Sequence, residues 1–349
     1  MVRTRTGWLV AVVALGLGVG ACKKKEEQKA GTSGDKTTEQ KAAGAADAVA
    51  KPAGAGAMVA GDDLSLLPAD SEVVIGLNFA QLQQSALWKQ FSPKLMEKAA
   101  SGLADFKAAC GFDPLEAIKS VSAGMKTAGD KADGIVVVHG PDKAKVMACL
   151  PKAKEEAAKK GGDVTIDGDT FMVKGKNGET SAWTFVGSDA LVGSVGPSAS
   201  KDLLLAAAKG GSALKTSQTF VEMHSKINTK ESMWFLVNGN APFMAKAAQA
   251  GVKPKAVFGS VNVTDGLTLD MRIRLGSPDE ATQLVNMAKG QTNNPQVKSM
   301  FDKLDVSGDG ADAKISIAMS NQKLQQLMGL IGGMMGGMMG GGGGGMGGP

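Results

Sequence analysis

The chain has no tyrosine and few other aromatic residues. Aromatic residues make up 4% of the 349 positions, so few rings are available to stack on sugars or nucleobases. There are two histidines, His139 and His224, and no Cys-x-x-Cys pair. This scarcity disfavours a histidine-based zinc site and a dithiol redox centre.

The first residues have the pattern of an export signal. Arg3 and Arg5 precede the apolar run WLVAVVALGLGVG at residues 8–20, which is short and glycine-rich for a membrane span and is typical of a secretory signal. The run ends in Val19-Gly20-Ala21-Cys22, which resembles the lipobox of bacterial lipoproteins. We therefore interpret residues 1–21 as a lipoprotein signal peptide.

The lipobox resemblance implies that Cys22 carries lipid and becomes the new N-terminus. Two or more acyl chains hold a protein stably at a membrane, at about 0.8 kcal/mol per buried CH₂. Lys23 follows the cysteine, and in Gram-negative lipoproteins lysine there, in place of aspartate, is associated with the outer membrane. We expect a lipid-anchored cell-envelope protein, at the outer rather than the inner membrane.

The charge that remains after removal of the signal peptide is small. Without Arg3 and Arg5, 37 basic residues face 34 acidic ones, a net charge of about +3. So small a charge predicts no nucleic-acid partner. Residues 22–63 are rich in Lys, Glu, Ala, Gly and Thr without periodic apolar residues, which predicts a disordered tether.

The body alternates predicted strands and helices. Asn78 is a plausible N-cap after the strand SEVVIGL, and Pro93 is expected to begin a second helix that ends near Cys110, with Cys110 facing the core. Gly140-Pro141-Asp142 is expected to open another helix, in which Cys149 points inward. Asp167-Gly168 predicts a hairpin turn, because glycine readily adopts the positive φ angle that such a turn requires.

The second half repeats the order of the first. Pro114 and Pro254 are about 140 residues apart, Pro141 and Pro278 about 137, and Asp167 and Asp309 about 142. Only the opening strands differ, with an offset of about 160. We predict an α+β fold of two tandem repeats, residues 64–211 and 212–331; whether they share one sheet is left open.

Two cysteines lie within the predicted fold. At the matching offsets Cys110 corresponds to Ala250 and Cys149 to Asn286, so the second repeat lacks both. Joint loss is what a disulfide predicts, and an exported chain meets an oxidising compartment. We expect a Cys110–Cys149 bridge; the alternative is two buried free thiols.

Few catalytic patterns are present. Ser198-x-x-Lys201 and Ser212-x-x-Lys215 resemble the Ser-x-x-Lys motif of penicillin-binding enzymes, but the Ser-Asp-Asn and Lys-Thr-Gly partner motifs are missing. Ser198 is more simply explained as a helix N-cap. The run from Asp305 to Gly310 resembles a calcium loop, yet its twelfth position is Ser316, so a hairpin turn explains it better. We expect no enzymatic activity and no cofactor.

The C-terminal residues 332–349 are mainly glycine and methionine. Met334, Met335, Met338 and Met339 carry thioethers, which suit Cu(I). Glycine opposes the fixed ligand positions that a metal site needs. We therefore favour a disordered tail and keep a soft-metal site as the alternative.

The body also resembles uncharacterised lipoproteins of Gram-negative bacteria. The resemblance rests on Leu67-Pro-Ala-Asp70 before the first strand and on Ser-x-Leu-Trp-Lys at residues 85–89; it implies no particular activity. The preferred function is a non-catalytic envelope protein that binds a protein partner or stabilises an assembly. The alternative is a carrier of an apolar ligand, or of Cu(I) through the methionines.

Overall fold

The structure, a computed structural model, describes residues 63–97, 100–128, 131–210, 213–245 and 251–327. The predicted signal peptide, the lipidation site Cys22, the tether up to residue 62 and the tail with its four candidate methionines lie outside the described residues.

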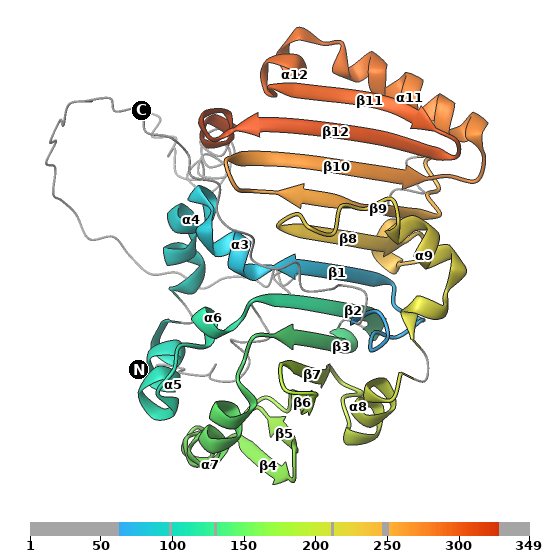
Figure 1. Cartoon of the computed structure of the whole chain (residues 1–349). Helices are drawn as coiled ribbons and strands as arrows, with labels where there is room; N and C mark the ends of the chain where they lie inside the picture. Colours follow the sequence, from blue (N-terminus) through green and yellow to red (C-terminus); the bar gives the residue numbers. More distant parts are fainter. Residues whose placement is uncertain (1–62, 98–99, 129–130, 211–212, 246–250, 328–349) are drawn as a thin grey trace, which may run out of the picture.

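The described strands form one antiparallel sheet of 12 strands. Figure 1 shows them stacked in the order β11-β12-β10-β9-β8-β1-β2-β3-β7-β6-β5-β4. Their bounds are β1 (Val73–Asn78), β2 (Ser120–Ala128), β3 (Lys131–His139), β4 (Asp163–Asp167), β5 (Thr170–Lys174), β6 (Thr180–Val186), β7 (Ala190–Val195), β8 (Met233–Asn238), β9 (Ala256–Asn262), β10 (Gly266–Arg274), β11 (Lys303–Asp309) and β12 (Asp312–Ser320).

Helices pack on both faces of this sheet, so the predicted α+β class is confirmed. The described helices are α3 (Phe79–Gln84), α4 (Ala86–Met96), α5 (Ala100–Cys110), α6 (Pro114–Ala117), α7 (Lys143–Lys159), α8 (Lys201–Ala208), α9 (Gln218–His224), α11 (Pro278–Thr292) and α12 (Pro295–Ser299), with short 3₁₀ turns η1 (Leu214–Thr216) and η2 (Pro242–Met244).

The two halves of the chain meet at the centre of the sheet. β1 pairs with β8, with Val73 opposite Val237 and Leu77 opposite Met233, and the two strands run side by side in Figure 1. Both halves therefore contribute to one sheet, which answers the question that the sequence left open. Gly76 is required at this junction, because a Cβ atom there would lie 2.0 Å from the indole nitrogen of Trp234.

Each sheet face has its own core. On one face Val136 and Val138 of β3 pack with Leu150 of α7; we call this the α7 face. On the other, Val137 of β3 packs with Leu204 of α8; we call this the α8 face. This alternation is the period-two pattern of a strand buried on both sides.

The C-terminal half continues the α7 face. Ile273 packs with α11, and the ladder of paired residues runs from Ile273 through Val257, Val237 and Val73 to Met125, a member of the α7-face core. Helices α7 and α11 thus cover opposite ends of the same sheet face.

Several local predictions are confirmed. The side chain of Asn78 accepts a hydrogen bond from the Gln81 amide at 3.1 Å, and Asp142 from the Lys145 amide at 2.8 Å, so both residues cap helices as expected. The β4–β5 hairpin closes through Gly168, whose φ is +58°.

Two helix starts were predicted wrongly. Pro93 lies inside α4 and does not begin a helix, because Ser85 caps α4 earlier by accepting from the Trp88 amide at 3.0 Å. Ser198 does not cap α8; Ser200 does, accepting from the Leu203 amide at 3.2 Å. The hydroxyl of Ser198 instead donates to the carboxylate of Asp133 near the start of β3.

Candidate functional site: an apolar cavity on the α7 face

A cavity of about 370 Å³ lies between the sheet and helices α5, α6 and α7. Its helix side includes Phe106, Phe112, Val146, Cys149, Leu150 and Ala153. Its sheet side includes Val138, Phe171, Val173, Trp183, Leu191 and Val195. Apolar side chains thus line both sides, and the volume is in the range of small-molecule sites.

Trp183 of β6 forms much of the cavity's sheet wall. It lies opposite Gly193 of β7, and a Cβ atom at Gly193 would come within 2.4 Å of the indole ring. Glycine at that position therefore leaves space for the indole to lie flat on the sheet. The indole nitrogen donates to the Ser181 hydroxyl at 2.8 Å, which satisfies its polar atom at one end of the cavity.

The predicted cysteine pair lies in the helix wall. Cys110 at the end of α5 and Cys149 in α7 form a disulfide, with Cα atoms 5.0 Å apart. Cys149 is buried and lines the cavity, whereas Cys110 is half-buried. The bridge therefore fixes α5 to α7 beside the cavity.

Other contacts hold α5 in the same place. Asp105 forms an ion pair with Lys160 beyond the end of α7 at 3.3 Å, and the ring of Phe106 meets that of Phe112 edge to face, with centroids 5.1 Å apart. Surface ion pairs contribute little, about 0.2–1 kcal/mol. The disulfide is the strongest described link between α5 and the rest of this wall.

The other polar residues noted in the sequence lie apart from this cavity. Ser198 donates its hydroxyl to Asp133 at 2.7 Å, whereas Lys201 bonds Asp167. Ser198 and Lys201 therefore bond different carboxylates and do not form the pair that the Ser-x-x-Lys motif requires, and Ser212 lies outside the described residues. The run from Asp305 to Gly310 forms the end of β11 and the start of the turn to β12, so it belongs to a hairpin, as predicted.

The two histidines occupy different environments. His139 ends β3 and donates from Nε2 to the buried carboxylate of Asp63 at 2.7 Å, and this hydrogen bond raises the pKa of His139. His224 stacks on Phe220 and meets Trp234 edge to face, and burial lowers its pKa. Among the described residues no cluster of three or more His, Cys, Asp or Glu side chains is suited to a metal ion.

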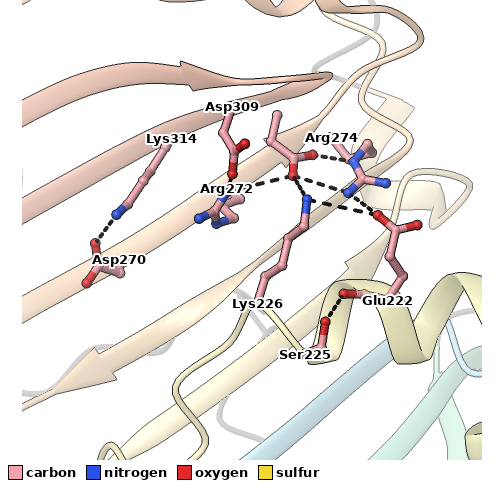
Figure 2. A network of polar contacts seen from close by, with 9 residues as sticks. Glu222, Ser225, Lys226, Asp270, Arg272, Arg274, Asp309 and Lys314 are labelled. Carbon is pink, nitrogen blue, oxygen red and sulfur yellow. Dashed lines mark hydrogen bonds and ion pairs between the residues drawn. The ribbon is translucent and has the colours of Figure 1, made fainter.

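A charged network occupies the α8 face of the C-terminal half (Figure 2). Its centre is the carboxylate of Asp312, which accepts hydrogen bonds from Arg274 and, at 3.0 Å, from Lys226. Three basic and three acidic side chains are connected: Lys226, Arg272 and Arg274 with Glu222, Asp309 and Asp312. A separate pair, Lys314 and Asp270, lies beside them. The charges balance, which indicates a structural network and not an anion site.

Burial and hydrogen bonding act on Asp312 in opposite directions. Burial raises the pKa of this carboxyl, but the hydrogen bonds and positive charges of Arg274 and Lys226 outweigh that effect and hold it below its usual range. Asp312 is therefore a buried, charged carboxylate whose partners compensate for its lost hydration.

Sequence reasoning kept a carrier of an apolar ligand as its alternative but did not locate the cavity, and it missed this network. The cavity residues of α7 and β6 have the apolar spacing of ordinary core positions, so nothing in the local pattern distinguishes a lined space from a filled one. Asp312 lies two residues beyond Gly310, and the hairpin turn predicted there gave it no role. The one useful signal was the alternation of Arg272 and Arg274 with apolar residues, which places two guanidinium groups on one sheet face.

Of the comparisons with known proteins, the one with solved structures alone found a similarity. The chain matches no protein-family description and no curated protein. Three solved structures, crystal forms I, III and IV of TP0453, are similar, each with a TM-score of 0.46 and 10% identity over 76% of this chain. The match spans 95 to 96% of those chains. Within the residues described above, no helix has the length and apolar character to cross a membrane.

Proposed function

We propose that this chain is a non-catalytic cell-envelope protein, anchored by lipid on Cys22, that binds an apolar ligand in the α7-face cavity. The observation that carries the proposal is the space itself: about 370 Å³ lined by aromatic and aliphatic side chains. Water in such a space has few hydrogen-bond partners, so an apolar group replaces it favourably.

The cavity favours a small-molecule ligand over the protein partner that the sequence suggested first. The exposed large apolar side chains of the described residues are spread over different elements, with Leu203 on α8, Val221 on α9 and Met287 on α11. Single exposed apolar residues are ordinary and mark no interface. The cavity, by contrast, gathers its apolar side chains in one place.

We also infer that the two halves arose by duplication. In each half a first strand is followed by a hairpin, β2–β3 or β9–β10, then by α7 or α11, and then by strands that return beside the hairpin. β7 pairs with β3 as β12 pairs with β10. By position in the sheet, β6–β7 corresponds to β11–β12. The sequence offset between Asp167 and Asp309 instead matches β4–β5 to β11–β12, so the two correspondences differ.

Blocking the cavity tests the proposed function. Ala153 is buried and lines the space, whereas Ala148 lies exposed on the same helix. Ala153→Trp fills the cavity with an indole; Ala148→Trp is the matched control. Binding of the uncharged probe N-phenyl-1-naphthylamine is followed by its fluorescence, and circular dichroism checks that both variants fold.

The expected result is saturable binding by the wild-type protein and by Ala148→Trp, and strongly weakened binding by folded Ala153→Trp. Equal binding by both variants, or no saturable binding by the wild-type protein, would overturn the proposal.

A further inference from the structure

We propose that the cavity's ligand is an amphiphile with one extended apolar chain and an anionic head group, held with its head beside Lys131. This inference rests on the proposed function and names the chemical class of its ligand. Three features support it: the cavity's length, the position of its polar side chains and the charge of the side chain at its polar end.

The cavity is elongated along the strands. Its lining includes Lys131 at the start of β3 and Val138 near the end of the same strand. At about 3.3 Å per residue, the seven steps between them span about 23 Å. A space of this length and modest volume suits one extended chain better than a bulky ring system.

The polar lining side chains gather at one end. All the lining residues that carry a charge or a hydroxyl group are Lys131, Glu179, Thr180 and Ser181. Ser181 pairs with Val195, which lies beside Gly134 near the start of β3.

The opposite end, where α6 and α7 begin, is lined by Phe112, Pro114 and Pro141. A ligand that matches this gradient is polar at one end and apolar along the rest.

The polar end carries two opposite charges, on Lys131 and Glu179, and the ammonium group of Lys131, which has no ion-pair partner among the described residues, favours an anion. Glu179 already accepts a hydrogen bond from the side chain of Asn177 at 3.1 Å. Lys131 is exposed and forms no ion pair with any other residue that the structure describes. A carboxylate, sulfate or phosphate head group would give this ammonium group a partner while remaining in contact with water.

The size of the expected preference for an anionic head group follows from the position of Lys131 at the surface. Exposed ion pairs contribute about 0.2–1 kcal/mol, which corresponds to a preference of up to about fivefold for an anionic over a neutral head group. The chain contributes more, because each buried CH₂ adds about 0.8 kcal/mol, or about fourfold in affinity.

The test compares head groups on one chain length. Hexadecanoate, 1-hexadecanol and hexadecylamine, each kept below the concentration at which it forms micelles, displace the uncharged naphthylamine probe from the purified protein. The variants are Lys131→Gln and Lys131→Glu. Lys145→Gln is the control, since it removes the same charge from an exposed position on α7.

For the wild-type protein and Lys145→Gln, hexadecanoate is expected to bind up to about fivefold more tightly than the alcohol, and the amine more weakly than both. Lys131→Gln removes the preference and Lys131→Glu reverses it. Equal affinity for all three head groups, or a preference that survives Lys131→Glu, would overturn this inference and leave the proposed function standing. Failure of the uncharged probe to bind the wild-type protein would instead defeat the proposed function.

Discussion

Replacing Asp312 by asparagine is expected to destabilise the C-terminal half by about 3 kcal/mol. Removing one partner from a buried ion pair costs about 3–5 kcal/mol, because the other charges remain without compensation. The side chain of Asp312 is 1% exposed, whereas those of Arg274 and Lys226 are 17% and 31% exposed. Water reaches both cations, so the lower end of that range applies.

The charge of the carboxylate makes this effect depend on pH. The folded-state pKa of Asp312 is lowered, so its stabilising contribution is fully present above the unfolded-state pKa of about 3.9. It is lost as the pH falls through the lower folded-state value. The difference between the wild-type protein and Asp312→Asn should therefore be constant from about pH 5 to pH 8 and shrink below about pH 4.

Urea denaturation followed by circular dichroism measures the free energy of unfolding of both proteins. Asp270→Asn is the matched control, because Asp270 lies on the neighbouring strand in a separate ion pair, with its side chain 62% exposed and 3.7 Å from Lys314. It should cost no more than about 0.5 kcal/mol. A cost below about 1 kcal/mol for Asp312→Asn, or equal costs for both variants, would refute the reasoning.

Three further predictions concern the cysteines and histidines. Replacing Cys110 and Cys149 together by serine should lower the free energy of unfolding by about 4 kcal/mol, the chain-entropy estimate for a loop of this size; two reactive thiols in the denatured, unreduced wild-type protein would contradict the bridge. Cys22→Ala should move the protein from the membrane to the soluble fraction, and unchanged retention in the membrane would contradict lipid anchoring. In an NMR titration the pKa of His139 should lie above about 6.5 and that of His224 below it. The contribution of His139 to stability is then full below about pH 6.5 and lost as the pH rises through its folded-state pKa, whereas that of His224 is lost as the pH falls below about 6.5. The reverse order of the two pKa values would contradict the structure.

Local chemistry made part of the fold predictable. Asn78 and Asp142 cap helices because a short side-chain oxygen next to an apolar run finds free backbone amides, and Gly168 closes a hairpin because it adopts a positive φ. Where two candidate residues compete, the local signal fails. Ser198 and Ser200 are equally good caps by type, and only the distant carboxylate of Asp133 decides between them.

Long-range pairing was beyond local reasoning. Nothing near Gly76 indicates that it opposes Trp234 across the centre of the sheet, although that contact joins the two halves. The cysteine pair was the exception, because comparison of the two halves showed its joint absence from the second. The cavity beside it depends on how far α5 stands from β6, a distance that apolar spacing does not encode.

Fluorescence quenching by a brominated ligand tests the central claim most directly. A dibrominated long-chain alcohol, which is uncharged, quenches tryptophan only on close approach; Trp183 lines the cavity, and Trp234 is buried on the α8 face. If the chain occupies the cavity, Trp183→Phe abolishes most of the saturable quenching and Trp234→Phe retains it. Quenching that persists in Trp183→Phe and disappears in Trp234→Phe would place the ligand elsewhere and contradict the proposed function.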